Sequence, residues 1–302
     1  MPDKSNKQKV LLAGAGGMLG AEFVDVFRKE GYDLRLVDQR NAASDVSALD
    51  ITSVKAVDSV VSEYSPDWIV NCAAYTQVDR AEVEADLAFQ VNAWGVAILA
   101  KAARNAGAKM VHISTDYVFG GDAAAKTRTT PYREDEPTAP CGVYGQSKCL
   151  GDELLCSLLP KAHLIVRTSW LHGPRGKNFV TAILDASRQK KELRVVNDQF
   201  GSPTWAPWLA QVVELLMKRG ATGLFHASSR GNISWFDFAK EICAQAGTNT
   251  TLLPQSTQEL ARPAPRPPYS TLDISKLEQY LDAECISWKE GVKAHLAVFG
   301  SA

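Results

Sequence analysis

The stretch Lys9-Val-Leu-Leu-Ala-Gly-Ala-Gly-Gly-Met-Leu-Gly20 decides the fold. A short apolar run opens it, a cluster of glycines follows at once, and the next segment, 21–30, has helical periodicity up to Gly31. Glycines between a strand and a helix let the backbone turn tightly and approach a pyrophosphate, while the helix N-terminus offers unpaired N–H groups. This order of elements predicts a dinucleotide-binding turn rather than a glycine-rich turn without a ligand.

Strand and helix signals alternate through the first half of the chain. We expect further strands at 33–37, 68–71, 110–114 and 163–167, and helices at 53–64, 86–104 and 143–159. Strands separated by helices pair in parallel through right-handed crossovers. The pattern therefore predicts an α/β fold with a doubly wound parallel sheet of the Rossmann type.

After Trp170 the alternation weakens, and tryptophans and prolines become more frequent. We expect a Rossmann dinucleotide-binding domain over 1–169 and a smaller C-terminal substrate-binding lobe mainly over 170–302, partly interleaved with the first. The glycine-, threonine- and proline-rich segment 120–141 is expected to be a long loop. The segment 262–268 holds four prolines and two arginines and is either a linker or a rigid loop near a ligand.

Composition excludes several classes of partner. The 302 residues include 33 Lys and Arg against 34 Asp and Glu, so no global positive field is available to bind nucleic acid or an anionic membrane. No apolar stretch is long enough to span a bilayer, and the polar N-terminus lacks the apolar core of a signal peptide. The six cysteines show no paired Cys-x-x-Cys spacing, which favours free thiols in a reducing cytoplasm over disulfides or a zinc site.

The end of the second expected strand carries two residues with opposite implications for the cofactor. Asp38 can accept hydrogen bonds from the adenosine ribose hydroxyl and favours NAD, whereas Arg40 can meet a 2′-phosphate and favours NADP. The choice between NADPH and NADH stays open. Asp50 is either a helix cap or a cofactor contact, and Asn92 either bridges backbone groups or orders the site.

Tyr144-Gly-Gln-Ser-Lys148 is the most informative local pattern. Its Tyr and Lys are four residues apart on an expected helix, so both project from one face. A nearby ammonium lowers the pKa of a phenol, which lets the pair give or take a proton at a carbonyl oxygen. Thr115 ends the fourth expected strand, where a hydroxyl can bond the same oxygen. Alone, such a Tyr and Lys are more often a solvated helix face, so the weight comes from these other motifs.

Together these residues resemble the dTDP-4-dehydrorhamnose reductase family, within the extended short-chain dehydrogenases. The similarity covers about residues 9–277. Its motifs are Asn71-Cys-Ala-Ala-Tyr-Thr-Gln-Val-Asp-Arg-Ala-Glu82, Ser114-Thr-Asp-Tyr-Val-Phe-Gly120, Arg167-Thr-Ser-Trp170, Asn197-Asp-Gln-Phe-Gly-Ser-Pro-Thr204 and Arg262-Pro-Ala-Pro-Arg266, which leads to Leu272-Asp273. Two departures stand out: Cys72 replaces the usual alanine, and the loop over 121–130 is longer than usual, which leaves the exact substrate open.

The resemblance implies reduction of the C4 ketone of dTDP-4-dehydro-L-rhamnose to dTDP-L-rhamnose with NADPH or NADH. It implies catalytic roles for Thr115, Tyr144 and Lys148. The candidate cofactor-binding residues are Gly14, Gly17, Met18, Leu19, Gly20, Asp38, Arg40, Asp50, Ile51, Cys72, Ala73, Ala74, Tyr75, Asn92, Tyr144 and Lys148. The candidate substrate-binding residues are Val78, Asp116, Phe119, Trp170, Asn178, Gln199 and Arg262.

The same resemblance implies a homodimer, with Mg²⁺ at the dimer interface in some members, although the sequence identifies no metal ligands. Two alternatives to rhamnose synthesis remain. One is a reductase of another dTDP-4-keto-6-deoxysugar, and the other is a non-catalytic nucleotide-binding regulatory subunit with the same fold. The intact Thr115, Tyr144 and Lys148 argue against the second.

Overall fold

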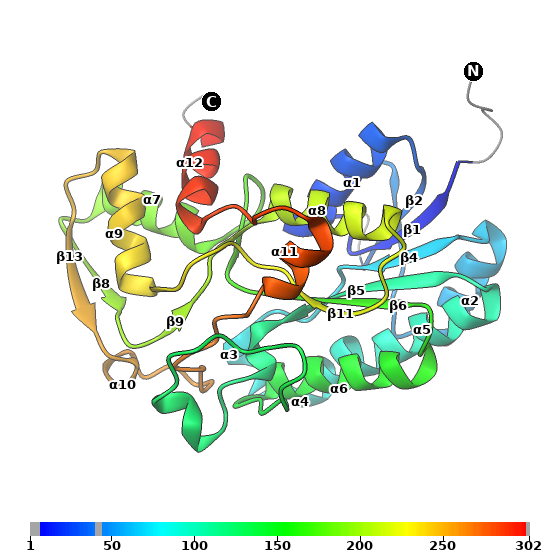
Figure 1. Ribbon diagram of the computed structural model, residues 1–302, viewed down its shortest axis with the longest axis horizontal. Coiled ribbons are helices and arrows are strands. Elements are labelled where there is room, and N and C mark those ends of the chain that lie inside the picture. Colours follow the sequence, from blue (N-terminus) through cyan, green and yellow to red (C-terminus); the bar gives the residue numbers. More distant parts are fainter. Residues whose placement is uncertain (1–6, 40–43, 300–302) are drawn as a thin grey trace.

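A seven-stranded, entirely parallel sheet lies at the centre of the computed structural model, which describes residues 7–39 and 44–299 (Figure 1). The strands of the sheet coincide with short apolar stretches of the sequence. From one edge to the other the strands are β3 (Val46–Ala48), β2 (Asp33–Asp38), β1 (Lys9–Ala13), β4 (Trp68–Asn71), β5 (Lys109–Thr115), β6 (His163–Thr168) and β11 (Gly223–His226). This order confirms the predicted doubly wound Rossmann sheet.

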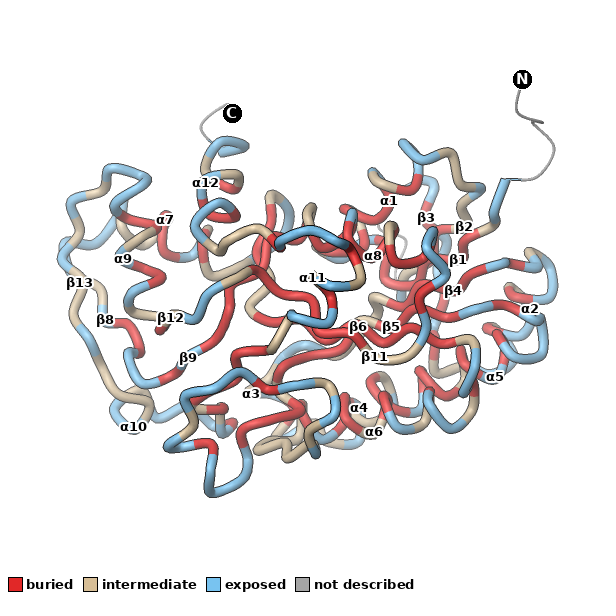
Figure 2. Tube along the Cα trace, in the orientation of Figure 1, coloured by how far each residue is buried: buried red, intermediate tan, exposed pale blue. Residues whose placement is uncertain are grey.

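Helices cover both faces of the sheet because successive side chains of each strand point to opposite sides. In β1, Val10 and Leu12 belong to one buried cluster, and Leu11 and Ala13 belong to the other. The first face is covered by α1 (Met18–Glu30), α8 (Ala206–Lys218) and α11 (Ser275–Leu281). The opposite face is covered by α2 (Val54–Tyr64), α5 (Gly95–Ala106) and α6 (Val143–Leu158). Figure 2 shows the buried strands of the sheet between helices that alternate between buried and exposed residues.

The segment expected to be one helix over 86–104 is divided. It consists of α4 (Ala85–Phe89), a π-helical turn (Gln90–Trp94) and α5, which follow one another without a break. A short helix, α3 (Val78–Ala81), precedes them, and 3₁₀ turns occupy Asp116–Val118 and Ala123–Lys126. Single π turns inside helices are often found at functional sites, and this one holds Asn92.

The second half of the chain builds a lobe with a core of its own, at the left of Figure 1. Its main helices and paired strands are α7 (Phe179–Gln189), α9 (Trp235–Ala246), α12 (Trp288–Phe299), β8 (Glu192–Val196) and β13 (Thr251–Gln255). Smaller elements are β7 (Leu171–His172) with β10 (Thr204–Trp205), β9 (Phe200–Gly201) with β12 (Ile233–Ser234), and α10 (Thr257–Leu260). Helices α8 and α11 and strand β11 follow residue 170 in the sequence but pack with the central sheet. The residues before and after the proposed boundary at 169/170 therefore do not form two separate cores.

Two buried histidines join α12 to the rest of this lobe. His172 in β7 and His295 in α12 are nearly inaccessible, and their Nδ1 atoms lie 3.0 Å apart. One ring must donate to the other, which requires at least one neutral imidazole. Burial lowers the pKa of His172 to about 3 and that of His295 to about 4. The folded protein therefore holds both rings neutral near physiological pH.

We expect this histidine pair to make the fold sensitive to acid. In the unfolded chain each imidazole titrates near pH 6.5. The pair's contribution is thus fully present above that pH and is lost as the pH falls towards 4. The slope is at most about 1.4 kcal/mol per pH unit for each histidine. Urea unfolding between pH 4.5 and 7.5 should show a shallower loss of stability in His295→Gln than in the wild type, and equal slopes would contradict this account.

Candidate active site

The glycine turn after β1 approaches the end of β4 too closely to admit a side chain. Gly14 has a φ of +82°, and a Cβ on it would lie 2.5 Å from the backbone nitrogen of Ala73. A Cβ on Gly20, in the first turn of α1, would lie 2.0 Å from the Gly14 carbonyl oxygen. Helix α1 begins after Gly17, which provides no side-chain cap. Its first N–H groups are therefore suited to an anionic group.

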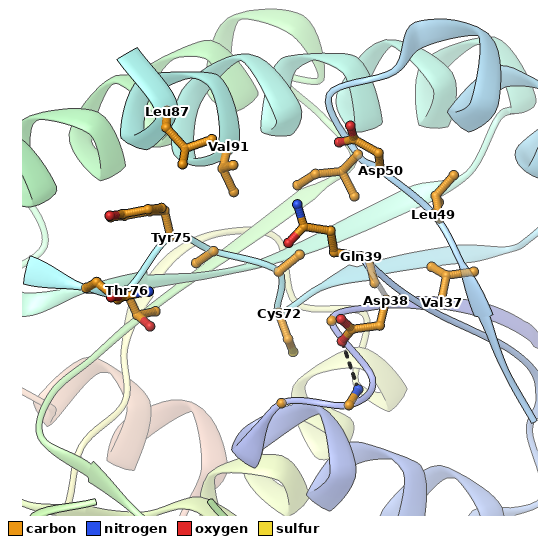
Figure 3. Close-up of a pocket in the computed structure, with 18 of the residues that line it drawn as sticks. Val37, Asp38, Gln39, Leu49, Asp50, Cys72, Tyr75, Thr76, Leu87 and Val91 are labelled. Carbon is orange, nitrogen blue, oxygen red and sulfur yellow. Dashed lines mark hydrogen bonds between the residues drawn. The ribbon is translucent and has the colours of Figure 1, made fainter. Parts of the chain in front are cut away.

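A pocket of 610 Å³ opens beside this turn, at the carboxyl ends of β1, β2 and β4 (Figure 3). This is where open parallel sheets bind ligands. The predicted cofactor residues that line it are Gly14, Gly17, Asp38, Asp50, Ile51, Cys72, Ala73, Ala74 and Tyr75. Met18, Leu19, Gly20, Asn92, Tyr144 and Lys148 do not line this pocket. Lining residues that the sequence reasoning missed include Gln77 and Arg80, which lie in the 71–82 motif but were given no role, and Gln39 and Leu87, which lie in no quoted motif.

Two acidic residues of the pocket also stabilise its walls. Asp38 Oδ2 accepts a hydrogen bond from the backbone nitrogen of Gly16 at 3.0 Å, the dashed line in Figure 3. Asp50 Oδ1 accepts from the backbone nitrogen and the hydroxyl of Thr52, at 2.9 and 2.7 Å. The residue that caps α2 is Ser53, so the helix-cap interpretation of Asp50 is wrong. Arg40, the proposed 2′-phosphate contact, lies outside the described residues.

Asn92 connects the pocket to α6. Its Oδ1 accepts from the backbone nitrogen of Tyr75 at 2.8 Å, and its Nδ2 donates to the Tyr75 carbonyl and to Ser147 Oγ, both at 3.0 Å. The fully buried amide thus bridges backbone groups and orders the site at the same time, so the two predicted alternatives are compatible. Because it lies in the π turn, it faces Tyr75 and α6 together.

Thr115 and Tyr144 meet where β5 ends against the first turn of α6. Burial raises the pKa of the Tyr144 phenol to about 12, against the smaller, opposite effect of its hydrogen bond with Thr115. The Tyr144 ring packs edge-on against Tyr117, with ring centroids 5.5 Å apart. Thr115 Oγ1 donates its one proton to Asp116 Oδ1 at 3.1 Å. Burial raises the pKa of Asp116 to about 7, against hydrogen bonds from Ser270 and Thr115.

Lys148 is almost completely buried one helical turn after Tyr144. Its Nζ donates to the carbonyl of Ile113 at 2.7 Å and lies 3.1 Å from His112 Nε2. Burial lowers the pKa of Lys148 to about 8, while Asp152 and Cys72 act in the opposite direction. The expected lowering of the Tyr144 pKa by Lys148 is not found here: Lys148 is not among the groups that shift the pKa of this phenol.

Glu82 fixes the helix that carries these two residues. Helix α6 begins after Gly142, which has no capping side chain, and Glu82 Oε1 accepts from the backbone nitrogen of Val143 at 2.9 Å. A carboxylate at a helix N-terminus is stabilising. Sequence reasoning included Glu82 in a motif but gave it no role, since nothing local indicated that a residue of another segment would cap α6.

The proposed substrate residues are divided between the surface and the interior. Val78 begins α3, and Trp170, with a φ of +47°, stacks on Trp235 at a centroid distance of 3.4 Å. Phe119 is fully buried and stacks on Tyr132 at 4.3 Å, so its ring belongs to the core. Asn178 caps α7 through its Oδ1 and donates from Nδ2 to Gly173. Gln199 is buried and donates to Thr257 Oγ1 at 3.0 Å.

The proline-rich segment 262–268 is bound to α3 by two arginines. Arg262 Nη1 lies 3.1 Å from Asp79 Oδ2, and Arg266 Nη2 lies 2.9 Å from Asp79 Oδ1. The Arg262 side chain is 54% exposed, whereas that of Arg266 is only 15% exposed. Of the two sequence interpretations, the rigid loop agrees better with this double anchor than the linker does.

Comparisons with known proteins place the chain in a family. Residues 8–300 match the family model described as "RmlD substrate binding domain". The chain is 40% identical to a dTDP-4-dehydrorhamnose reductase of Streptomyces griseus over 275 residues, which are 88% of this chain and 86% of the relative. It is 39% identical to the spore coat polysaccharide biosynthesis protein SpsK of Bacillus subtilis, over 97% of this chain and 99% of that protein.

The chain belongs to the dTDP-4-dehydrorhamnose reductase family. The crystal structure of the Bacillus anthracis reductase in complex with NADP matches it with a TM-score of 0.89 and 38% identity, over 97% of this chain and 99% of that chain. The predicted family and the expectation of an NAD(P)H-dependent oxidoreductase are therefore confirmed.

The described residues contain no group of three or more His, Cys, Asp and Glu side chains that could hold a metal ion. The Mg²⁺ implied by the resemblance thus has no supporting site in this part of the chain. No helix within ranges 7–39 and 44–299 is long and apolar enough to cross a membrane.

The glycine turn gives a direct test of the cofactor pocket. We expect Gly14→Ala to weaken NADPH and NADH binding at least tenfold, because the new Cβ would push the turn away from Ala73. The matched control is Gly107→Ala, which has a similar positive φ of +71° but no neighbouring atom within 4 Å. Calorimetric titration of both variants measures the effect. An affinity for Gly14→Ala equal to that of the control would show that the close approach to Ala73 is not needed for cofactor binding.

Proposed function

We propose that this chain reduces the C4 ketone of dTDP-4-dehydro-L-rhamnose to dTDP-L-rhamnose with NADPH or NADH. The observation that carries the proposal is the contact of Thr115 with Tyr144, one helical turn from Lys148, in a chain that is similar over almost its whole length to proteins named for this reaction.

The residues of the pocket fit a nicotinamide dinucleotide. Because Gly14 lets the turn pack against the Ala73 backbone, the start of α1 borders the pocket at Gly16 and Gly17, where its uncapped N–H groups would bind a pyrophosphate. Ala73 and Ala74 line the pocket with small side chains. Asp38, which lines the pocket, would accept a hydrogen bond from a ribose hydroxyl and so favour NADH, and Arg40 stays the proposed contact for a 2′-phosphate. When bound, the cofactor supplies the hydride that C4 receives.

Tyr144 would donate the proton that the reduced ketone oxygen requires. Because burial raises its pKa to about 12, the phenol is protonated at neutral pH and can act as an acid. Hydride addition at C4 converts the C=O bond to an alkoxide, and transfer of the phenolic proton completes the alcohol. The Thr115 hydroxyl would orient the same oxygen from the end of β5.

Other sugars are real alternatives because similarly close relatives have other names. The chain is 36% identical to a dTDP-4-keto-6-deoxy-D-glucose reductase of Streptomyces niveus and 38% identical to a probable 4-ketoreductase of Streptomyces antibioticus. Oxidation of NADPH, followed with a panel of dTDP-4-keto-6-deoxysugars, tests the choice. Fastest turnover with the L-rhamnose precursor supports the proposal, another preferred sugar replaces it, and cofactor binding without turnover of any sugar indicates the regulatory subunit.

The homodimer implied by the resemblance is also part of the proposal. Sedimentation equilibrium should give twice the 32.8 kDa mass of one chain, and a mass that stays at that of one chain would exclude the dimer.

The proton donor is tested by removing one oxygen atom. We expect Tyr144→Phe to lower kcat by about 10²- to 10⁴-fold, because loss of a general acid typically has that cost, while NADPH affinity is kept. The control is Tyr132→Phe, which removes a buried hydroxyl that has no hydrogen-bond partner among the described residues. Lys148→Met should cost at least as much as Tyr144→Phe, and the double variant little more. A near-wild-type kcat in Tyr144→Phe would mean that another group supplies the proton.

Arg262 is the candidate for binding the substrate diphosphate, since arginine presents a fixed fork of donors to phosphate oxygens. We expect Arg262→Ala to raise KM for the sugar nucleotide about tenfold or more and to leave KM for the cofactor nearly unchanged. Arg194→Ala is the control, because that side chain is comparably exposed, at 60%, and lies on β8. Equal changes in both KM values would remove Arg262 from the substrate site.

A further inference from the structure

A buried polar side chain, that of His112, lies next to Lys148 and is not among the predicted site residues. His112 of β5 is fully buried, between Asn71 at the end of β4 and Lys148 on α6. Asn71 and His112 are register partners on adjacent strands. Asn71 Nδ2 lies 3.1 Å from His112 Nδ1, and Lys148 Nζ lies 3.1 Å from His112 Nε2. Each ring nitrogen therefore has one polar neighbour.

Asn71 determines which ring nitrogen carries the proton. The backbone nitrogen of Ala73 donates to Asn71 Oδ1 at 3.0 Å, which fixes the amide with its NH₂ group towards the ring. His112 Nδ1 must then accept, and the proton of a neutral imidazole must lie on Nε2. The ring is neutral because burial and the nearby Lys148 hold the pKa of His112 well below its usual range.

Asp152 is consistent with this tautomer. Its Oδ1 is buried, has no hydrogen-bond partner among the described residues, and lies 3.8 Å from His112 Nε2. Its other oxygen, Oδ2, accepts from Arg167 Nε at 3.1 Å. A carboxylate on this side of the ring favours a proton on Nε2 rather than on Nδ1.

The Nε2–H group consequently faces the Lys148 nitrogen. An ammonium has three donors and no acceptor, whereas a neutral amine has a lone pair that can accept from Nε2–H. The Ile113 carbonyl accepts from the same nitrogen in either state. The other ionisable groups that act on Lys148 are Asp152, in the same helix, and Cys72, after β4. Both favour the ammonium, so His112 opposes them.

We propose that His112, with its proton fixed on Nε2 by Asn71, is a positioning residue that holds the nitrogen of Lys148, one helical turn after Tyr144, and favours its neutral form. This inference rests on the proposed reductase function for its kinetic consequence, but not for its structural one. According to this inference, two residues outside the Tyr-x-x-x-Lys pattern, Asn71 of β4 and His112 of β5, help to set the protonation state of Lys148.

Two substitutions of His112 separate positioning from packing. In His112→Gln the amide oxygen can face Lys148 and accept from it, which favours the ammonium. In His112→Leu the volume is largely kept and the polar contact is lost. We would measure kcat from pH 6 to 10 at saturating NADPH, with the dTDP-4-keto sugar that the wild type reduces fastest, together with the melting temperature of each variant.

We expect the alkaline limb of kcat to move up by about one pH unit in His112→Gln, with kcat within about tenfold of wild type. His112→Leu should lose about 10- to 100-fold in kcat with little change in KM for the sugar, because the lysine is no longer held in place. A merely structural histidine would lower the melting temperature without moving the limb. Wild-type kcat and an unmoved limb in both variants would overturn the inference.

A substrate-independent measurement keeps this test separate from that of the proposed function. The Lys148 ¹⁵Nζ resonance, assigned by comparison with Lys148→Met and titrated by NMR, should shift its midpoint upward in His112→Gln. If no sugar is reduced by the wild type, the proposed function fails and this titration alone decides. An unchanged Lys148 titration midpoint in His112→Gln would overturn the inference. If His112→Gln does not fold, His112→Leu decides: an unchanged Lys148 midpoint in that folded variant would also overturn the inference.

Discussion

The close approach of the Gly14 backbone to the backbone of Ala73 is the constraint on which the rest of the structure depends. β1 lies between β2 and β4, so the chain must turn tightly where β1 ends. A Cβ at Gly14, in this turn, would lie 2.5 Å from the backbone nitrogen of Ala73, which follows β4. Because Gly14 has no side chain, the turn can place the N-terminus of α1 at the carboxyl edge of the sheet. The pocket, its acidic rim at Asp38 and the small residues after β4 all follow from that placement.

Much of the fold was predictable because buried parallel strands are short apolar runs separated by amphipathic helices. β11, with the sequence Gly-Leu-Phe-His, was missed because its four residues include two that are only partly buried and it lies in the half of the chain where the alternation weakens. The division of the long helix before residue 106 was missed for a different reason. The π turn accompanies contacts from Asn92 to Tyr75 and Ser147, and no local sequence preference encodes such tertiary contacts.

The site was predictable where one element carries the pattern and hidden where several elements meet. Tyr144 and Lys148 share a helix, so their spacing made them candidates, and the glycine turn and Thr115 gave that spacing its weight. His112 lies inside the apolar run of β5, a pattern that indicates a core residue. Its polar partners come from two other elements, β4 and α6, which the local sequence does not show. Phe119 is a different case. The family resemblance implies a place for it around the substrate, and the structure adds that its ring is fully buried against Tyr132, a contact that the sequence pattern does not indicate.

The single proton of the Thr115 hydroxyl limits how the reaction can be arranged. In the structure Thr115 donates to Asp116 and accepts from the backbone nitrogen of Tyr117. A hydroxyl has one donor, so Thr115 can orient a ketone oxygen by donation only if it releases Asp116. With a pKa of about 7, Asp116 is near the point of protonation at neutral pH, and Ser270 Oγ still donates to its other oxygen at 2.5 Å. Protonation of Asp116 weakens its hold on the Thr115 proton, because a neutral carboxyl is a poorer acceptor than a carboxylate. The hydroxyl that the substrate needs is thus bound to a group whose charge is itself set by burial.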